Sequence, residues 1–389
     1  MLPPQKVIYV LTYLPEESAE EGFYETHLRE RLLVVRAREL GFESRLYLLT
    51  NGRKVRRIED DCEAWAFPVD RNRCGHGRHT STALLNRIDT DMPDLLVFKG
   101  MGYRLATWLV AHSRRPFRFA FIVGGTARDT VEPLASYVLA ESEQQISQYF
   151  RRRISDGSVA VLPKTLLPSD FRDGGQKRYD IVSVGSVTAR KNHRELVPLF
   201  RDYRVAIIGD GPLLGDLRAQ AADCEDRVYM PGNLSRSQVL DVIAHSRLMV
   251  HPATMEGVPR VFGESFACGV PVVALRSAIR GSFQEGVHGS LVARKELIPR
   301  VRELLADPQG LAEMGCKARE WARAYLGPEA AARVAQLMYQ RVFSEAPVSK
   351  SAASWRLRVR ARQVYWFLAM EPRRVAKRLG LRKLLKPVR

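Results

Sequence analysis

Two glutamates eight positions apart, Glu256 and Glu264, are the acids whose spacing in this chain most suggests chemistry. A glycine and a proline soon after Glu256 predict a loop, and the small and apolar residues 261–268 that follow are typical of a buried helix. One carboxylate would then precede a helix and the other would lie in its first turns, beside free N–H groups that suit an anion. The alternative is a helix cap together with an unrelated surface acid.

A second group of residues whose types suggest chemistry is basic. Residues 180–184 have the apolar character of a buried strand, and the loop after them, from Gly185 to Asn192, carries Arg190 and Lys191 side by side. Backbone N–H groups and cations that converge at a helix start suit a phosphate. A solvated basic turn is the alternative.

Two further loops follow predicted strands in the same half of the chain. In Gly209-Asp210-Gly211-Pro212 the glycines permit a tight turn and the close approach of a ligand to the backbone. Residues 232–235 follow a short apolar run, and Ser235 at their end is suited to cap a helix. Capping is the role that we expect for this serine.

The elements that must position these loops alternate between short apolar runs and stretches of helical periodicity. This alternation occurs twice, which predicts an α/β fold of two doubly wound parallel sheets with a cleft at the carboxyl ends of their strands. The expected strands are 7–11, 44–49, 94–98, 119–123, 180–184, 204–208, 228–230, 248–250 and 272–275. The expected helices are 25–40, 103–112, 238–246 and one that begins in the loop after Gly185. The expected domain organisation is an amino-terminal domain at 1–165, a linker at 166–179, a carboxyl-terminal domain at 180–328, a helix that crosses back at 329–346 and a basic tail at 347–389.

The glutamate motif resembles the Glu-x7-Glu signature of the GT-B glycosyltransferases of the family 4 type, and the likeness extends from about residue 6 to about residue 342. This resemblance implies two Rossmann-like domains facing a cleft. It also implies transfer of a sugar from a nucleotide-diphosphate sugar to an acceptor, with retention of configuration, in the synthesis of a surface polysaccharide or a glycolipid. Glu264 would bind the donor ribose hydroxyls, and Glu256 would lie at the donor sugar as the catalytic residue. No metal or other cofactor is expected, because cations of the protein would neutralise the diphosphate and no Asp-x-Asp motif suits a sugar diphosphate.

Further donor-binding residues follow from the same resemblance. Lys191 matches the lysine of the family's Gly-Arg-Leu-x-x-x-Lys segment, Ser186 stands where the arginine usually is, and Arg190 is a candidate to replace that arginine. Gly211 belongs to a turn that matches the family's Gly-x-Gly-Pro. The other expected donor contacts are Asn233 and Leu234 near the base, and Gly257, Val258, Pro259 and Arg260 around the sugar and phosphate. The commoner family loop has Phe-Gly after the first glycine, and proline lacks an N–H, so the identity of the donor stays open.

The acceptor side is expected in the amino-terminal domain. Residues 22–27 resemble the family's Gly-x-x-Glu-x-His loop, which gives Gly22 and His27 as candidates. Lys99 stands at a position where relatives often carry histidine. The helix that contains Tyr339 matches one by which relatives cross back onto the first domain; a stripe facing the core, with Val334 and Leu337, is the alternative.

The net charge of +18 is concentrated at the end of the chain. Residues 350–389 hold 13 Lys and Arg against one acid, Glu371, a net +12 that leaves +6 for the first 349 residues. Among these cations lie Trp355, Tyr365, Trp366 and Phe367, a composition that suits an anionic membrane surface. A solvated or partly docked tail is the alternative. We expect no nucleic-acid partner, because a nucleic-acid-binding body would carry more of the charge.

Other features exclude some classes of protein. No apolar run approaches the roughly 20 residues that span a bilayer, and the start of the chain lacks the features of a secretory signal. Five separated cysteines without a Cys-x-x-Cys pair indicate free thiols. We therefore expect a cytoplasmic protein, peripheral at the inner face of the membrane if the tail binds there. A nucleotide-sugar epimerase, a phosphorylase of similar fold and a basic nucleic-acid-binding protein are the alternatives.

Overall fold

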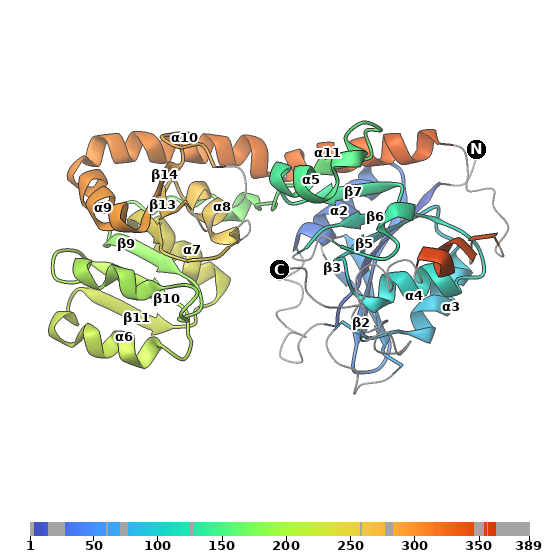
Figure 1. Ribbon diagram of the computed structural model, residues 1–389, viewed down its shortest axis with the longest axis horizontal. Coiled ribbons are helices and arrows are strands. Elements are labelled where there is room, and N and C mark those ends of the chain that lie inside the picture. The colour runs from blue at the N-terminus through green and yellow to red at the C-terminus, as the bar shows by residue number, and fades with distance from the viewer. Residues whose placement is uncertain are drawn as a thin grey trace, which may run out of the picture. The chain divides into compact units, whose positions relative to one another are not determined.

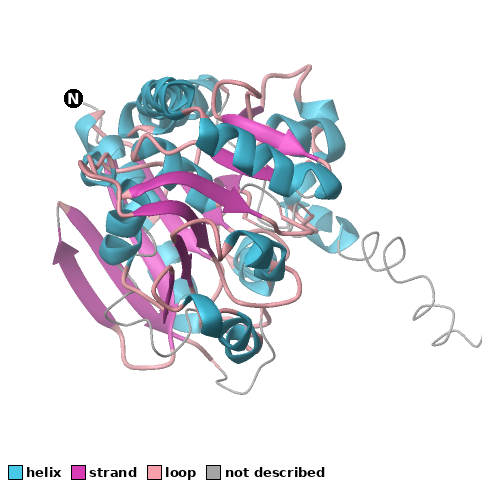
Figure 2. Ribbon diagram, turned by 90° about the vertical axis from the view of Figure 1, so that its left-hand side faces the viewer, coloured by secondary structure: helices cyan, strands magenta, loops and turns pink. Residues whose placement is uncertain are grey.

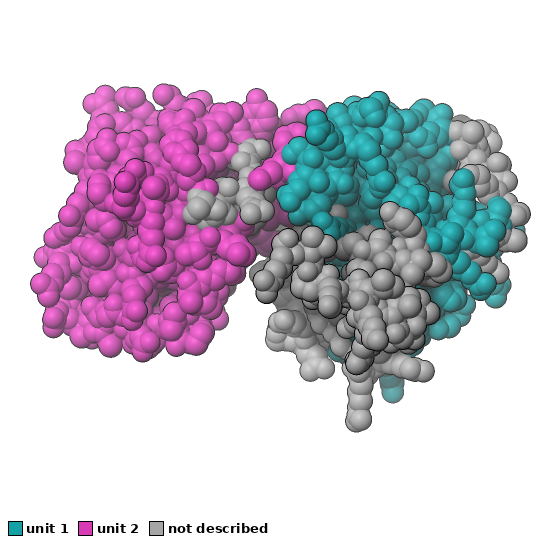
Figure 3. Space-filling model, in the orientation of Figure 1, with its two compact units in different colours: residues 1–140, 145–162, 334–389 teal, residues 141–144, 163–333 magenta. Residues whose placement is uncertain are grey.

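The computed structural model describes most of the chain as two compact units (Figure 3). Unit 1 comprises residues 1–140, 145–162 and 334–389, and unit 2 comprises residues 141–144 and 163–333. The described residues are 4–14, 28–59, 61–70, 77–124, 128–256, 259–276, 283–345, 354–355 and 357–362. Each unit is built on its own sheet (Figure 1).

Unit 1 contains an eight-stranded sheet in the order β3-β4-β2-β1-β5-β6-β7-β8. All neighbouring strands are parallel except β3 and β4, which pair as an antiparallel hairpin at one edge. The strands are β1 (Lys6–Leu11), β2 (Glu43–Thr50), β3 (Val55–Glu59), β4 (Cys62–Pro68), β5 (Leu95–Lys99), β6 (Arg118–Ile122), β7 (Tyr137–Ala140) and β8 (Val159–Val161). The helices are α2 (Leu28–Glu39), α3 (Thr82–Asp91), α4 (Arg104–His112), α5 (Glu143–Tyr149) and most of α11 (Pro328–Ser344). The residues of α5 are divided between the two units. Two short 3-10 turns are η1 (Glu132–Leu134) and η2 (Arg151–Arg153).

Successive side chains of a strand point to opposite faces of the sheet. Different helices cover the two faces of this sheet. Ile8 and Val10 of β1 point into a core that includes side chains of α3 and α4. Tyr9, between them, is fully buried and its hydroxyl is hydrogen-bonded to that of Tyr339 on α11. Tyr339 therefore packs in unit 1. Leu337 of the same helix is 55% exposed, so the predicted stripe does not include it.

Unit 2 contains a six-stranded, wholly parallel sheet in the order β11-β10-β9-β12-β13-β14, with helices packed against its strands (Figure 2). The strands are β9 (Tyr179–Val184), β10 (Val205–Ile208), β11 (Val228–Gly232), β12 (Ser246–His251), β13 (Val272–Leu275) and β14 (Gly289–Val292). The helices are α6 (Leu214–Gln220), α7 (Arg236–Ala244), α8 (Arg260–Ala267), α9 (Leu297–Ala306) and α10 (Pro308–Leu326), with 3-10 turns η3 (Pro168–Asp170), η4 (His193–Leu199), η5 (Ala222–Cys224) and η6 (Arg294–Glu296). Separate apolar clusters fill its two faces. The predicted α/β class with two mostly parallel sheets is confirmed.

Two local expectations differ from the structure, and one pair of strands was not expected. The helix predicted after Gly185 is a 3-10 turn, η4, that begins only at His193 and contains Pro198, whose missing N–H removes a helical hydrogen bond. The polar stretch 166–179, which we expect from sequence to be a linker, packs closely on unit 2: Asp170 is buried, and a Cβ on Gly174 would lie 1.9 Å from the carbonyl oxygen of Ala244. The β3–β4 hairpin was not predicted at all.

The start of the basic tail is part of the core of unit 1. Trp355 is buried, its indole N–H donates to the carbonyl oxygen of Val110 at 3.0 Å, and its ring packs edge-on against Phe119. Val359 is fully buried in the same cluster. Trp355 is therefore a core residue and not the interfacial aromatic that the sequence suggested. The predicted aromatics at 365–367 lie outside the described residues. No helix in the described parts of the chain has the length and apolar character needed to cross a bilayer.

Candidate active site at the carboxyl edge of the second sheet

The candidate site lies where the strand order of unit 2 reverses. β9 is flanked by β10, the next strand along the chain, and by β12, which comes later. In open parallel sheets such a reversal leaves a crevice outside the carboxyl ends of the strands, where ligands bind. The loops that begin at Gly185, Gly209 and Pro252 leave these three strands at that edge.

Glu256 lies at the centre of a group of basic side chains. Its Oε1 is 2.7 Å from Nζ of Lys191 and 2.8 Å from Nη1 of Arg190. Arg190 also donates to the carbonyl oxygen of Met255 at 3.1 Å. The side chains of Glu256 and Lys191 are each only 12% exposed. The loop after β9 and the loop after β12 thus form one charged cluster.

Burial and nearby charges act in opposite directions on Glu256. Burial alone would raise the pKa of the carboxyl group, but the hydrogen bond and charge of Lys191 outweigh it and hold the pKa below its ordinary value. Glu256 is therefore ionised at neutral pH.

His251, the last residue of β12, is a buried neighbour of this cluster. Its Nε2 is 3.9 Å from Oε1 of Glu256, too far for a hydrogen bond, and neither ring nitrogen has a hydrogen-bond partner among the described residues. Burial, with the charge of Lys191, lowers the pKa of His251 to about 4. His193 behaves similarly, with a pKa of about 4 for the same two causes. Both rings are therefore neutral at physiological pH.

Glycines bring the loops of the site together. The side chain of Lys191 lies over Gly185, where a Cβ would be 3.0 Å from its Cε. Gly209 has φ +137° and a Cβ there would meet the carbonyl oxygen of Gly185 at 2.2 Å, so only glycine fits. The carbonyl oxygen of Arg190 accepts the backbone N–H of Thr254 at 2.9 Å, which joins this loop to the glutamate loop.

Glu264 lies in the second turn of α8 and is 7% exposed. Burial raises its pKa, and the charges of Arg236 and Arg260 oppose that rise. Its Oε1 is 3.4 Å from Nε of Arg236, and both outer nitrogens of that guanidinium donate to Asp170 at 2.7 Å. The two glutamates of the motif thus have separate cationic partners.

The predicted site residues differ in their contacts and in their exposure to solvent. Lys191 and Arg190 contact Glu256. Ser186, Asn233 and Arg260 are exposed, Gly211 and Leu234 are half-buried, and Pro259 is a buried cap of α8. Ser235 caps α7 by accepting the N–H of Gln238, which confirms its structural role. The predicted contacts Gly257 and Val258 lie outside the described residues, as do Gly22 and His27.

The remaining acceptor-side candidate, Lys99, is at the end of β5 in unit 1, with its Nζ 3.6 Å from Oε1 of the buried Glu30.

Sequence reasoning missed three residues of the site region in unit 2. His251 directly follows the apolar run of β12, which was a usable signal. Arg236 and Asp170 gave none, because their pairing depends on a contact between distant segments.

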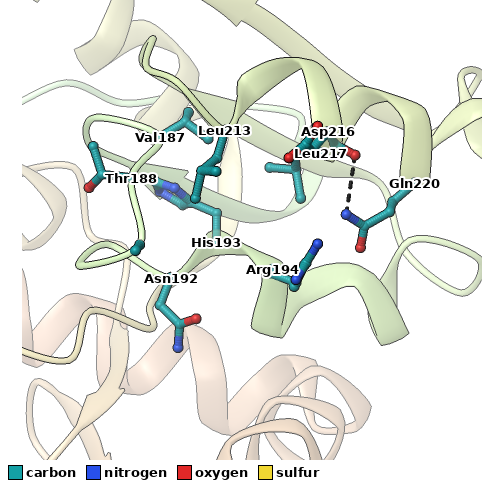
Figure 4. Close-up of a pocket in the computed structure, with 10 residues that line it drawn as sticks. Val187, Thr188, Asn192, His193, Arg194, Leu213, Asp216, Leu217 and Gln220 are labelled. Atoms are coloured by element: carbon teal, nitrogen blue, oxygen red, sulfur yellow. Dashed lines mark hydrogen bonds between the residues drawn. The ribbon is translucent and has the colours of Figure 1, made fainter.

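A hollow of about 290 Å³ lies beside the loop from Gly185 to Asn192. Its lining comes from the loop after β9, from the start of η4, and from α6, which contributes Asp216, Leu217 and Gln220 (Figure 4). The side chain of His193 also lines it, and the Nδ1 atom of this residue has no hydrogen-bond partner among the described residues. Among those residues, no three His, Cys, Asp or Glu side chains are grouped so as to hold a metal ion.

Comparisons with known proteins agree with this architecture. Residues 170–321 match the family described as "Glycosyl transferases group 1". A GDP-mannose-dependent alpha-(1-6)-phosphatidylinositol monomannoside mannosyltransferase of Mycolicibacterium smegmatis is 33% identical over 185 residues, which cover 44% of this chain and 45% of that protein. The 2-deoxystreptamine glucosyltransferase of Streptomyces kanamyceticus is 29% identical over 158 residues, 39% of this chain and 41% of that protein. The chain thus spans about half the length of the curated relatives it matches.

Solved structures extend the likeness to both units. HepE of Anabaena, crystallised in complex with UDP, superposes with a TM-score of 0.59 at 15% identity, over 86% of this chain and all of that one. At this identity the superposition shows the fold. The chain therefore has the GT-B fold that the resemblance of the Glu-x7-Glu motif implied, and its residues 170–321 are similar to the group 1 glycosyl transferases.

Proposed function

We propose that this protein is a glycosyltransferase that moves a sugar from a nucleotide-diphosphate sugar to an acceptor. The observation that carries the proposal is the group of Glu256, Lys191 and Arg190 at the carboxyl edge of the parallel sheet. When the bond between the anomeric carbon and the diphosphate breaks, negative charge develops on the phosphate and positive charge on the sugar. Two cations and one carboxylate that lie together are suited to stabilise those two charges.

The roles of the two acids then differ. Glu256 is the proposed catalytic residue at the donor sugar, and Lys191 and Arg190 take the diphosphate. Glu264, in the second turn of α8, takes the ribose hydroxyls, for which a carboxylate is an acceptor of two hydrogen bonds. The cations of the protein replace a metal. Transfer occurs with retention of configuration, and this part of the proposal rests on the Glu-x7-Glu motif alone.

The acceptor is proposed to be lipid-linked or a related carbohydrate. The Mycolicibacterium relative is named for a phosphatidylinositol monomannoside acceptor and for GDP-mannose, whereas the Anabaena neighbour was crystallised with UDP. The base of the donor must therefore be found by experiment. With a lipid-linked acceptor, the cations of residues 348–389 would hold the protein peripherally at an anionic membrane.

A panel of nucleotide sugars tests the proposal. The full chain is heated with UDP-, GDP-, ADP- and dTDP-sugars in metal-free buffer, and the midpoint of thermal unfolding is recorded. A ligand at 100 times its Kd stabilises the folded state by about 2.7 kcal/mol, which raises the midpoint measurably. At least one donor should do so in the parent and not in Glu264→Ala. No response to any donor would remove the proposal.

A further inference from the structure

Arg236 joins two acids from segments far apart in the sequence. Its Nη1 and Nη2 donate to the two carboxylate oxygens of Asp170, each at 2.7 Å, and its Nε is 3.4 Å from Oε1 of Glu264. Arg236 is the first residue of α7, Asp170 belongs to the segment before β9, and Glu264 lies in α8. A single guanidinium thus connects three segments of unit 2.

We infer that Arg236 and Asp170 are positioning residues that fix the carboxylate of Glu264 for the ribose of the donor nucleotide. This inference rests on the proposed function, which assigns the ribose to Glu264. It goes beyond that function because neither Arg236 nor Asp170 belongs to the motifs that led to it.

The geometry around Asp170 makes it a fixed anchor. The residue is 1% exposed, and its Oδ2 also accepts the backbone N–H of Leu167 at 2.8 Å. A carboxylate held in this way binds a guanidinium through two parallel hydrogen bonds, which sets the plane of the guanidinium as well as its distance. Once that plane is set, the position of Nε is set with it, 3.4 Å from Oε1 of Glu264.

Glu264 is left with unused acceptor capacity. The 3.4 Å contact to Arg236 is the single ion pair or side-chain hydrogen bond of this carboxylate within the described part of the chain. An ionised carboxylate offers about four acceptor sites. The Glu264 side chain is 9% exposed and has one long contact, so its position is restricted while most of its acceptor sites stay unused. That is the state required of a group that must still accept two ribose hydroxyls.

The same arrangement controls the ionisation of Glu264. The groups that act on it are Arg236 and Arg260, whose charges favour the carboxylate, and Asp170, whose charge opposes it, all against burial. Because Asp170 is paired with Arg236, removing the guanidinium both withdraws a cation and exposes Glu264 to an uncompensated acid. As pH falls, Glu264 should then be protonated, and donor binding lost, at a higher pH than in the parent.

The chain offers a matched control. Arg247, also in unit 2, is 25% exposed and pairs with Asp180 at 3.3 Å, whereas Arg236 is 26% exposed and pairs with Asp170. Arg247 also donates to the carbonyl oxygen of Leu305, and no described contact joins it to Glu256 or Glu264. Arg247→Gln therefore tests the loss of a similar ion pair without a link to the site.

The experiment measures the Kd of UDP and of GDP by calorimetric titration between pH 5.5 and pH 8. The proteins are the parent, Arg236→Lys, the double variant Asp170→Asn with Arg236→Gln, and Arg247→Gln. The double variant removes both members of the Asp170–Arg236 pair, so neither of these two charges is left without the other, and circular dichroism verifies its fold. We expect about a tenfold weaker Kd at pH 7 for the double variant, a smaller loss for Arg236→Lys and no change for Arg247→Gln. As pH falls, we also expect the double variant to lose affinity at a higher pH than the parent does, because the Arg236 charge that it removes acts on Glu264 more strongly than the Asp170 charge.

A cycle with Glu264→Gln separates positioning from a structural effect. If Arg236 acts through Glu264, the tenfold loss disappears when both changes are combined with Glu264→Gln. A double variant that binds with the parent's Kd and pH profile overturns the inference and leaves the proposed function intact. A loss that persists in full on the Glu264→Gln background also overturns it. A parent that binds neither UDP nor GDP, nor any donor of the panel, overturns the proposed function and this inference with it.

Discussion

The ammonium of Lys191 and the carboxylate of Glu256 lie 2.7 Å apart, although they belong to loops that follow different strands. The carboxylate of Glu256 is thus paired with Lys191, a cation that the diphosphate of the proposed donor also requires. Binding of the donor would therefore replace the carboxylate of Glu256 with phosphate as the partner of Lys191. The acid would at the same time be released toward the sugar.

Glu256→Gln should separate binding from turnover. The amide cannot stabilise positive charge on the sugar, so turnover should fall at least 100-fold, comparable to the loss of one strong electrostatic contact. The Kd for a nucleoside diphosphate should stay the same or tighten, because Lys191 and Arg190 lose their competing partner. Calorimetric titration and a product assay measure the two effects. Glu195→Gln, which breaks the surface pair with Arg294, is the control. Weaker diphosphate binding in Glu256→Gln would contradict the exchange of partners.

Gly209 and Gly215 should respond to alanine in opposite ways. At Gly209 the added Cβ meets the carbonyl oxygen of Gly185 at 2.2 Å with φ at +137°, so Gly209→Ala should destabilise unit 2 by roughly 2 kcal/mol or more and weaken donor binding. Gly215 lies in α6 with nothing within 4 Å of the added atom, and Gly215→Ala should raise stability by roughly 0.5–1 kcal/mol. Urea unfolding compares the two, and equal effects would refute the loop contact.

Acid should destabilise the protein partly through His251. The folded-state pKa of about 4 is below the ordinary value of 6.5, because burial and Lys191 disfavour the charged ring. Between these values the unfolded chain binds the proton first, so stability falls as pH falls from 6.5 to 4. His251→Asn should reduce this slope by up to about 1.4 kcal/mol per pH unit. Urea unfolding from pH 4.5 to pH 7 measures the slope, and an unchanged slope would mean that His251 titrates normally.

The start of the tail should contribute to the stability of unit 1. Trp355→Ala removes a buried ring and its hydrogen bond to Val110, and should cost about 3–5 kcal/mol. Leu357→Ala, on a side chain that is 70% exposed, should change stability by less than about 0.5 kcal/mol. Chemical unfolding of both variants decides the matter. Equal stability of the two would mean that this part of the tail does not belong to the core.

The fold was predictable where the sequence pattern reports burial directly. Strands such as β13 (Val272–Leu275) are buried on both faces and read as continuous apolar runs, and their bounds were predicted to the residue. The β3–β4 hairpin was missed because charged residues such as Arg56 and Glu63 interrupt its pattern and pair with each other across the strands. η4 could not be told from an α-helix, because the effect of a proline depends on the hydrogen bonds around it.

The candidate site was predictable at the level of motifs and not of contacts. Lys191, Glu256 and Glu264 were identified from local spacing. Their partners depend on strand order, because the contact of Arg190 with Glu256 requires β9 and β12 to be neighbours. Asp170 lies in a stretch whose polar composition indicated a linker, and nothing local distinguishes a buried acid from a solvated one. Trp355 shows the same limit, since its basic surroundings suggested a surface position.

The most direct test of the central claim is the release of nucleoside diphosphate from UDP- and GDP-sugars by the full chain, with carbohydrate and lipid-linked acceptors present, compared with Glu264→Ala. The account predicts release from at least one donor by the parent and a loss of at least tenfold in kcat/KM in Glu264→Ala, while Glu195→Gln acts as the parent does. If no donor is consumed, or if Glu264→Ala consumes it at the parent's rate, the account of this site is wrong.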